Sequence, residues 1–190
     1  KRQEEVLTLL QSIKGYSLAA RVRDNFISEK QLASPEIMFS VRFLRPNLTH
    51  SMDLYYGAWA VLDPTRNMVD AFECTDGKPW GESPLTVRPD ESILYGNDDA
   101  LKKAERAKMF MNRDRRLYES VNHSMMANFV DDGFKDEEVQ VNESNNKGPT
   151  GFSALKYVQP TDVTPGYSTV SDADIVVLRY AHVLLMIAEA

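Results

Sequence analysis

The last nineteen residues constrain the fold more than any other part of the chain. Residues 172–190 read DADIVVLRYAHVLLMIAEA, an apolar run interrupted by Arg179 and His182. The run is too short for a bilayer span, and a charged side chain within it would be costly in lipid. It therefore predicts a helix over 176–190 that is buried in protein. In that setting Arg179 needs a carboxylate or carbonyl partner, and Glu189 lies too far along the helix to be the natural one.

Composition excludes several classes of protein. Of the 190 residues, 43% are hydrophobic and 26% are charged, with nine glycines and nine prolines, so a collagen-like, low-complexity or disordered chain is ruled out. The single cysteine, Cys74, excludes an intrachain disulfide and a cysteine-based zinc cluster. The formal charge of -6 repels phosphates, so we expect no nucleic-acid partner.

Periodicity predicts mostly α structure with a few short strands and long irregular loops. Helical spacing appears in residues 1–15 and again in 100–110, while residues 36–44 alternate with the period of two that a strand requires. The alternation in RLYESVNHSM, residues 116–125, predicts a further strand. Asp63 followed by Pro64 predicts the start of a short helix.

Two irregular segments are candidate ligand loops. Residues 45–62 have no sustained period, and residues 77–92 contain four glycines and prolines between Gly77 and Pro84. Flat aromatic rings in an ordered loop can stack on a ligand. The concentrated aromatic side chains of these loops, and hence the predicted ligand-binding residues, are Tyr55, Tyr56, Trp59 and Trp80. The alternative is that Tyr56 and Trp59 merely pack beneath their loop.

Catalytic and metal-binding patterns do not stand out in the sequence. Its three histidines, His50, His123 and His182, have no metal-binding spacing. It has no Gly-x-Ser-x-Gly elbow, no phosphate-binding glycine loop and no carboxylate pair distinguished by context. We therefore expect no catalytic residues, no metal and no cofactor, and interpret the chain as a binding protein.

Four stretches of the chain, taken in order, resemble segments of one protein family. VVLRYAHVLLMIAEA at 176–190 is similar to the family's (I/V)LRYADVLLMYAEA helix, with His182 in place of the usual aspartate. VDAFECTDGK at 69–78 and NRDRRLYESV at 112–121 resemble two further family segments, the second with Arg115 in place of proline. PEIMFSVRF at 35–43 resembles the strand that precedes them. Together the four stretches resemble the SusD/RagB family of cell-surface glycan-binding lipoproteins.

The resemblance implies both an architecture and a function. Residues 1–190 would be a single SusD-like region, truncated at both ends, within a scaffold of tetratricopeptide-like helical pairs. The intact protein would be exposed at the outer-membrane surface through an N-terminal lipid-modified cysteine that this chain lacks, since Cys74 is internal. It would bind oligosaccharide and deliver it to a SusC-like TonB-dependent transporter. A peptide-binding role and a docking or transporter-assembly role remain alternatives.

Overall fold

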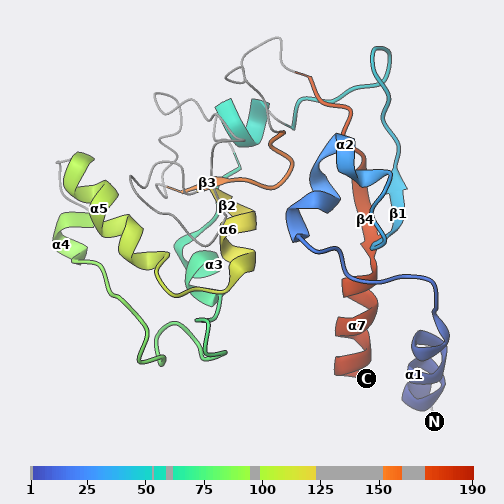
Figure 1. Ribbon diagram of the computed structural model, residues 1–190, viewed down its shortest axis with the longest axis horizontal. Helices are drawn as coiled ribbons and strands as arrows, with labels where there is room; N and C mark the ends of the chain where they lie inside the picture. The colour runs from blue at the N-terminus through green and yellow to red at the C-terminus, as the bar shows by residue number, and fades with distance from the viewer. Residues whose placement is uncertain (1, 53, 59–61, 95–98, 123–151, 160–169) are drawn as a thin grey trace. The chain divides into compact units, whose positions relative to one another are not determined.

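The computed structural model describes residues 2–52, 54–58, 62–94, 99–122, 152–159 and 170–190. The chain divides into two compact units. Unit 1 combines residues Lys1–His50 with Ser171–Ala190, and unit 2 comprises Ser51–Val170. Most of the regular structure is helical, with short paired strands in each unit (Figure 1). The predicted fold class is therefore confirmed, whereas the arrangement in helical pairs stays a prediction.

Unit 1 is built around an antiparallel pair of strands from opposite ends of the sequence. β1 (Ile37–Val41) pairs with β4 (Ile175–Arg179), so that Ile37 lies opposite Arg179 and Val41 opposite Ile175. The 3-10 helix η1 (Val22–Phe26) leads into the short helix α2 (Ser28–Gln31). α1 (Arg2–Ser12) lies near α7 (Tyr180–Glu189), which continues directly from β4 (Figure 1).

The helix predicted over 176–190 begins later and is less buried than expected. Residues 175–179 form β4, because β-branched Val176 and Val177 suit the strand that pairs with β1. α7 starts after Arg179, whose backbone N–H donates to Nδ1 of His182 at 3.0 Å. Within α7 only Val183 is buried, and Leu185 is 67% exposed. The prediction of a single buried helix is therefore wrong in its boundary and in its burial.

The buried ion pair predicted for Arg179 is present, and its partner is Glu36. Nη1 of Arg179 lies 2.7 Å from a carboxylate oxygen of Glu36, whose side chain is 2% exposed. The same carboxylate accepts from the backbone N–H of Ala19 at 3.0 Å and from Nδ2 of Asn25 at 2.9 Å. Its lone pairs are thus shared between three donors, which offsets the cost of removing the charge from water.

A second buried carboxylate, that of Asp174, links β1 and the residues that follow it, and the backbone of Asp174 contacts α2. Asp174 accepts from the backbone N–H of Phe43 at 3.0 Å and from Oγ of Ser40 at 3.1 Å. The side-chain amide of Gln31 bonds both the N–H and the carbonyl of Asp174. The polar face of β1 is therefore the face that contacts the interior, while Phe39 on the other face is 60% exposed.

Unit 2 is organised around a large apolar cluster. Its helices are α3 (Arg66–Ala71), α4 (Glu91–Leu94), α5 (Asp99–Met109) and α6 (Arg115–Ser120), with a single π-helical turn, η2, at Leu54–Ala58. β2 (Val121–Asn122) pairs antiparallel with β3 (Ser153–Ala154). The cluster contains Val69, Cys74, Trp80, Leu94, Met109, Phe110, Leu117, Tyr118, Val121 and Phe152.

The strand predicted over 116–125 is mostly a helix. A carboxylate oxygen of Asp114 accepts from the backbone N–H of Arg116 at 2.8 Å and so caps α6. In the helix Leu117 and Tyr118 are both buried, which an alternating strand would not allow. Residues 121–122 alone are extended, and residues 123–125 lie outside the described residues.

The cap of α3 is Thr65 and not the predicted Asp63. Oγ1 of Thr65 accepts from the backbone N–H of Met68 at 3.2 Å. Both carboxylate oxygens of Asp63 are instead buried, without a hydrogen-bond donor in the described part of the chain. Burial raises the pKa of the Asp63 carboxyl above its ordinary value.

Replacing Arg179 by Met should lower the free energy of unfolding by about 3 kcal/mol, because Glu36 would keep a buried charge without its cation. Lys30→Gln is the matched control. It breaks the Lys30–Asp24 pair, whose side chains are 44% and 24% exposed, and should cost less than about 1 kcal/mol. Urea denaturation of both variants measures the difference, and equal losses would contradict a central role for the buried pair.

Asp63→Asn should raise the free energy of unfolding at neutral pH by about 1 kcal/mol, because it removes a buried charge without a donor. A raised pKa means that the folded state holds the proton more tightly than the unfolded chain. The wild-type protein should therefore lose stability relative to the variant as pH rises through about 4, and match it below. Denaturation at several pH values tests this, with exposed Glu82→Gln as control. A pH-independent difference would contradict it.

Candidate functional site

Arg113 joins the two family-like segments of unit 2. It is 1% exposed, and its guanidinium donates to the carbonyl oxygens of Val69 at 2.6 Å, Phe72 at 2.8 Å and Met109 at 2.5 Å. Val69 and Phe72 lie in and just after α3, and Met109 ends α5. The planar fork of five donors allows a single side chain to hold both helix ends.

Backbone hydrogen bonds complete this junction. The N–H of Asp114 donates to the carbonyl of Glu73 at 2.8 Å, and the N–H of Thr75 donates to the carbonyl of Asn112 at 2.9 Å. Asn112 has a φ of 57°, a left-handed conformation that asparagine tolerates better than most residues. Residues 69–75 and 112–116 therefore form one local structure, although they are far apart in the sequence.

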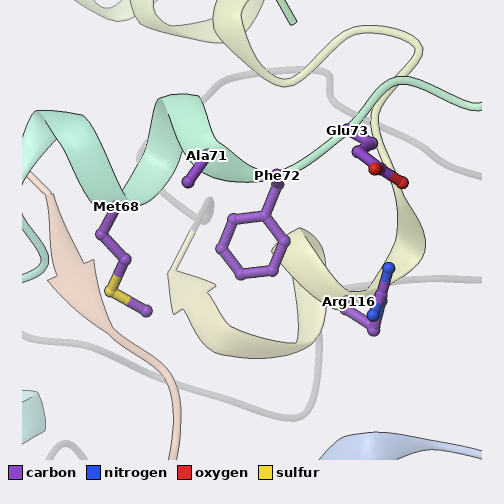
Figure 2. Close-up of a pocket in the computed structure, with 5 residues that line it drawn as sticks. All are labelled: Met68, Ala71, Phe72, Glu73 and Arg116. Carbon is purple, nitrogen blue, oxygen red and sulfur yellow. The ribbon is translucent and has the colours of Figure 1, made fainter. Parts of the chain in front are cut away.

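A pocket of about 420 Å³ opens at this junction. Its lining combines α3 and the residues that follow it with one residue of α6: Met68, Ala71, Phe72, Glu73 and Arg116. Met68 and the Phe72 ring form an apolar side, and Glu73 and Arg116 face one another beside them (Figure 2). Phe72 also packs against the apolar cluster, which fixes its ring.

The charged groups of the pocket are unequally engaged. Arg116 donates to both carboxylate oxygens of Asp114, at 2.9 and 2.7 Å. This contact lowers the pKa of the Asp114 carboxyl and raises that of the Arg116 guanidinium. Glu73 is exposed, and its negative charge also raises the pKa of the Arg116 guanidinium. The carboxylate of Glu73 accepts no hydrogen bond from any residue in the described ranges. Glu73 is thus available to a ligand.

Trp80 lies in the core and not on a binding surface. It is 5% exposed, and three guanidinium groups lie near its ring, with Arg113 at 5.2 Å and Arg66 and Arg88 at 5.6 Å from the centroid. A stacking platform needs an open ring face. The expectation that Trp80 contacts ligand does not fit this position, and the indole has a structural cation–π role.

The other predicted aromatic residues lie on or beside η2. Tyr55 is 41% exposed, whereas Tyr56 packs against the buried pair Leu155 and Val158. Trp59 lies outside the described residues. The structure thus brings Tyr55 and Tyr56 together on one turn and separates their roles, one towards solvent and one towards the interior.

No group of three side chains suitable for a metal ion occurs among the residues described. Within the same residues, no helix is long and apolar enough to span a membrane.

Two solved structures similar to this fold are described as SusD-like proteins. One is described as a SusD-like carbohydrate binding protein from Bacteroides fragilis; it matches 99% of this chain at 17% identity with a TM-score of 0.62. A second SusD-like protein from the same organism matches 99% at 21% identity and 0.55. The chain spans 36% and 39% of their respective lengths. No curated protein sequence matches it.

The sequence itself assigns the family. The model of the SusD family matches residues 32–190, and the chain therefore belongs to that family.

Sequence reasoning missed the pocket residues. Phe72 and Glu73 lie inside the segment 69–78 and Arg116 inside 112–121, where they served only as evidence of resemblance. The feature of the sequence that could have indicated them is the set of polar and charged residues at the end of an apolar stripe. Only the contact between the two segments shows that these side chains share one pocket.

Replacing Arg113 by Lys should lower the free energy of unfolding by about 2 kcal/mol, because one ammonium cannot satisfy three divergent carbonyl groups. Arg88→Lys is the matched control: Arg88 lies over the same indole, is exposed and donates to the carbonyl of Gly81 at 3.2 Å. Guanidinium denaturation compares them. If both substitutions had equally small effects, Arg113 would not hold the junction.

Proposed function

We propose that this protein binds oligosaccharides without chemical change and delivers them to a SusC-like TonB-dependent outer-membrane transporter. The observation that carries the proposal is the SusD-family match over residues 32–190. A solved protein of the same fold is described as carbohydrate binding, which supports a sugar as the ligand. In the intact protein, an N-terminal lipid anchor would hold the site at the cell surface.

The predicted aromatic loop supplies the binding mode. Tyr55 on η2 is 41% exposed, while packing of Tyr56 on Leu155 and Val158 anchors the same turn. Covering roughly 100 Å² of sugar at about 25 cal/mol per Å² is worth about 2 kcal/mol, so a few such contacts suffice for weak capture. We propose that Tyr55, with Trp59 from the same loop, stacks on sugar and that Tyr56 positions the turn.

Weak binding suits delivery to a transporter. Stacking and hydrogen bonding hold a sugar without forming a covalent bond, so the ligand can be released intact. A binding protein of this kind also needs no bound cofactor.

Tyr55→Ala should weaken binding of the preferred oligosaccharide by at least about tenfold, because it removes a stacking surface worth more than about 1 kcal/mol. Calorimetry against a panel of oligosaccharides, with the intact protein, measures the effect. Tyr16→Ala is the matched control, since Tyr16 is a similarly exposed tyrosine (39%) in unit 1.

Three outcomes would decide against the proposal. Failure of the wild-type protein to bind any oligosaccharide would remove the proposed ligand class. Co-purification with a transporter in the absence of ligand binding would favour the assembly role. Turnover of an oligosaccharide that is abolished by replacing one carboxylate would identify an enzyme.

A further inference from the structure

The pocket at the end of α3 differs from the predicted aromatic loop in both shape and charge. Its lining includes none of Tyr55, Tyr56 and Trp80. It combines an aromatic ring, a thioether and a methyl group with an acid that follows α3 and a base of α6 (Figure 2). Its volume of about 420 Å³ falls within the roughly 300–1,000 Å³ typical of small-molecule sites.

The charges around the pocket leave one carboxylate without a hydrogen-bonded cation. Asp114 holds Arg116 through two hydrogen bonds at 2.9 and 2.7 Å, whereas Glu73 accepts none from the described residues. Asp114, which does not line the pocket, thus neutralises the charge of Arg116 and leaves the charge of Glu73 unbalanced. The pocket is therefore complementary to a ligand that carries one positive charge.

The position of Glu73 is fixed by its backbone. Its carbonyl accepts from the N–H of Asp114, and the following residue, Cys74, is buried and bonds the carbonyl of Lys78 through its N–H at 2.9 Å. The neighbouring Phe72 is held by Arg113 through its own carbonyl. The backbone from which the carboxylate and the ring project is thus held in place, which lowers the entropic cost of binding.

We propose that this pocket binds an amino sugar unit, with its protonated amine on Glu73 and its C–H face on Phe72. The inference rests on the proposed function, because it names a class of sugar for a SusD-family binding protein. An acidic sugar would meet the carboxylate of Glu73 and a guanidinium already bound to Asp114, and a neutral sugar would leave Glu73 without a cation. A lysine side chain offers the same ammonium but lacks a flat C–H face and loses more rotamer freedom on binding.

Calorimetry with a glucosamine disaccharide and its N-acetylated counterpart tests the proposal on the purified wild-type protein. The free-amine disaccharide should bind at least about tenfold more tightly than the acetylated one, because a charge-assisted hydrogen bond is lost on acetylation. Added salt should reduce this preference, since the interacting charges lie near the surface.

Glu73→Gln should abolish the preference for the amine while leaving the backbone contacts of residue 73 intact. Glu82→Gln is the matched control, because Glu82 is also exposed in unit 2 but does not line the pocket. This control should keep the full preference. Thermal unfolding of both variants checks that they fold as the wild type does.

The outcomes separate this inference from the proposed function. Equal binding of the two disaccharides would overturn the amino-sugar assignment and leave oligosaccharide binding standing. Binding lost in Tyr55→Ala but unchanged in Glu73→Gln would place the sugar at the loop and overturn the pocket site. Trilysine that binds more tightly than the disaccharide, with the same dependence on Glu73, would replace the sugar by a peptide.

Discussion

The buried guanidinium of Arg113 is the contact on which unit 2 depends. A cation in an apolar cluster is costly unless every strong donor direction is used, and burial lowers the pKa of the Arg113 guanidinium. Arg113 offsets most of this cost with three carbonyl oxygens, which its two terminal nitrogens reach, and with the face of Trp80, whereas its Nε is buried without an acceptor in the described part of the chain. Because those carbonyls belong to different helix ends, satisfying the charge also fixes the helices.

In unit 1 the guanidinium of Arg179 is stabilised by an ion pair and not by carbonyl groups. Comparing the two arginines shows what a sequence can reveal. The need of Arg179 for a partner follows from its apolar surroundings, and the structure confirms it. The partner itself, Glu36, lies 143 residues away and could not be chosen from 28 acidic side chains. The identity of this distant partner depends on the pairing of β1 with β4, and a local sequence pattern does not show which strands pair.

Local sequence patterns predicted the elements in which a regular period extends over many residues or in which the ends are marked. They failed where the sequence favours both a helix and a strand. α1, β1 and α5 follow the expected periods. Residues 115–120 alternate over too short a stretch to specify a strand, and the Asp114 cap decides for a helix. At residues 175–179, β-branched side chains and an available partner strand outweigh the continuous apolar run that predicts a helix.

At the candidate site, the backbone groups and the side chains of the same residues have separate roles. Residue type alone ranked Trp80 above Phe72, although the indole is buried and the phenyl ring lines the pocket. Residues 72 and 73 are held at the junction through their carbonyl groups, which accept from Arg113 and Asp114. Their side chains are not needed for these bonds, so the junction can keep its geometry while the pocket changes its chemistry. A rigid backbone with replaceable side chains is the arrangement that allows one fold to serve ligands of different charge.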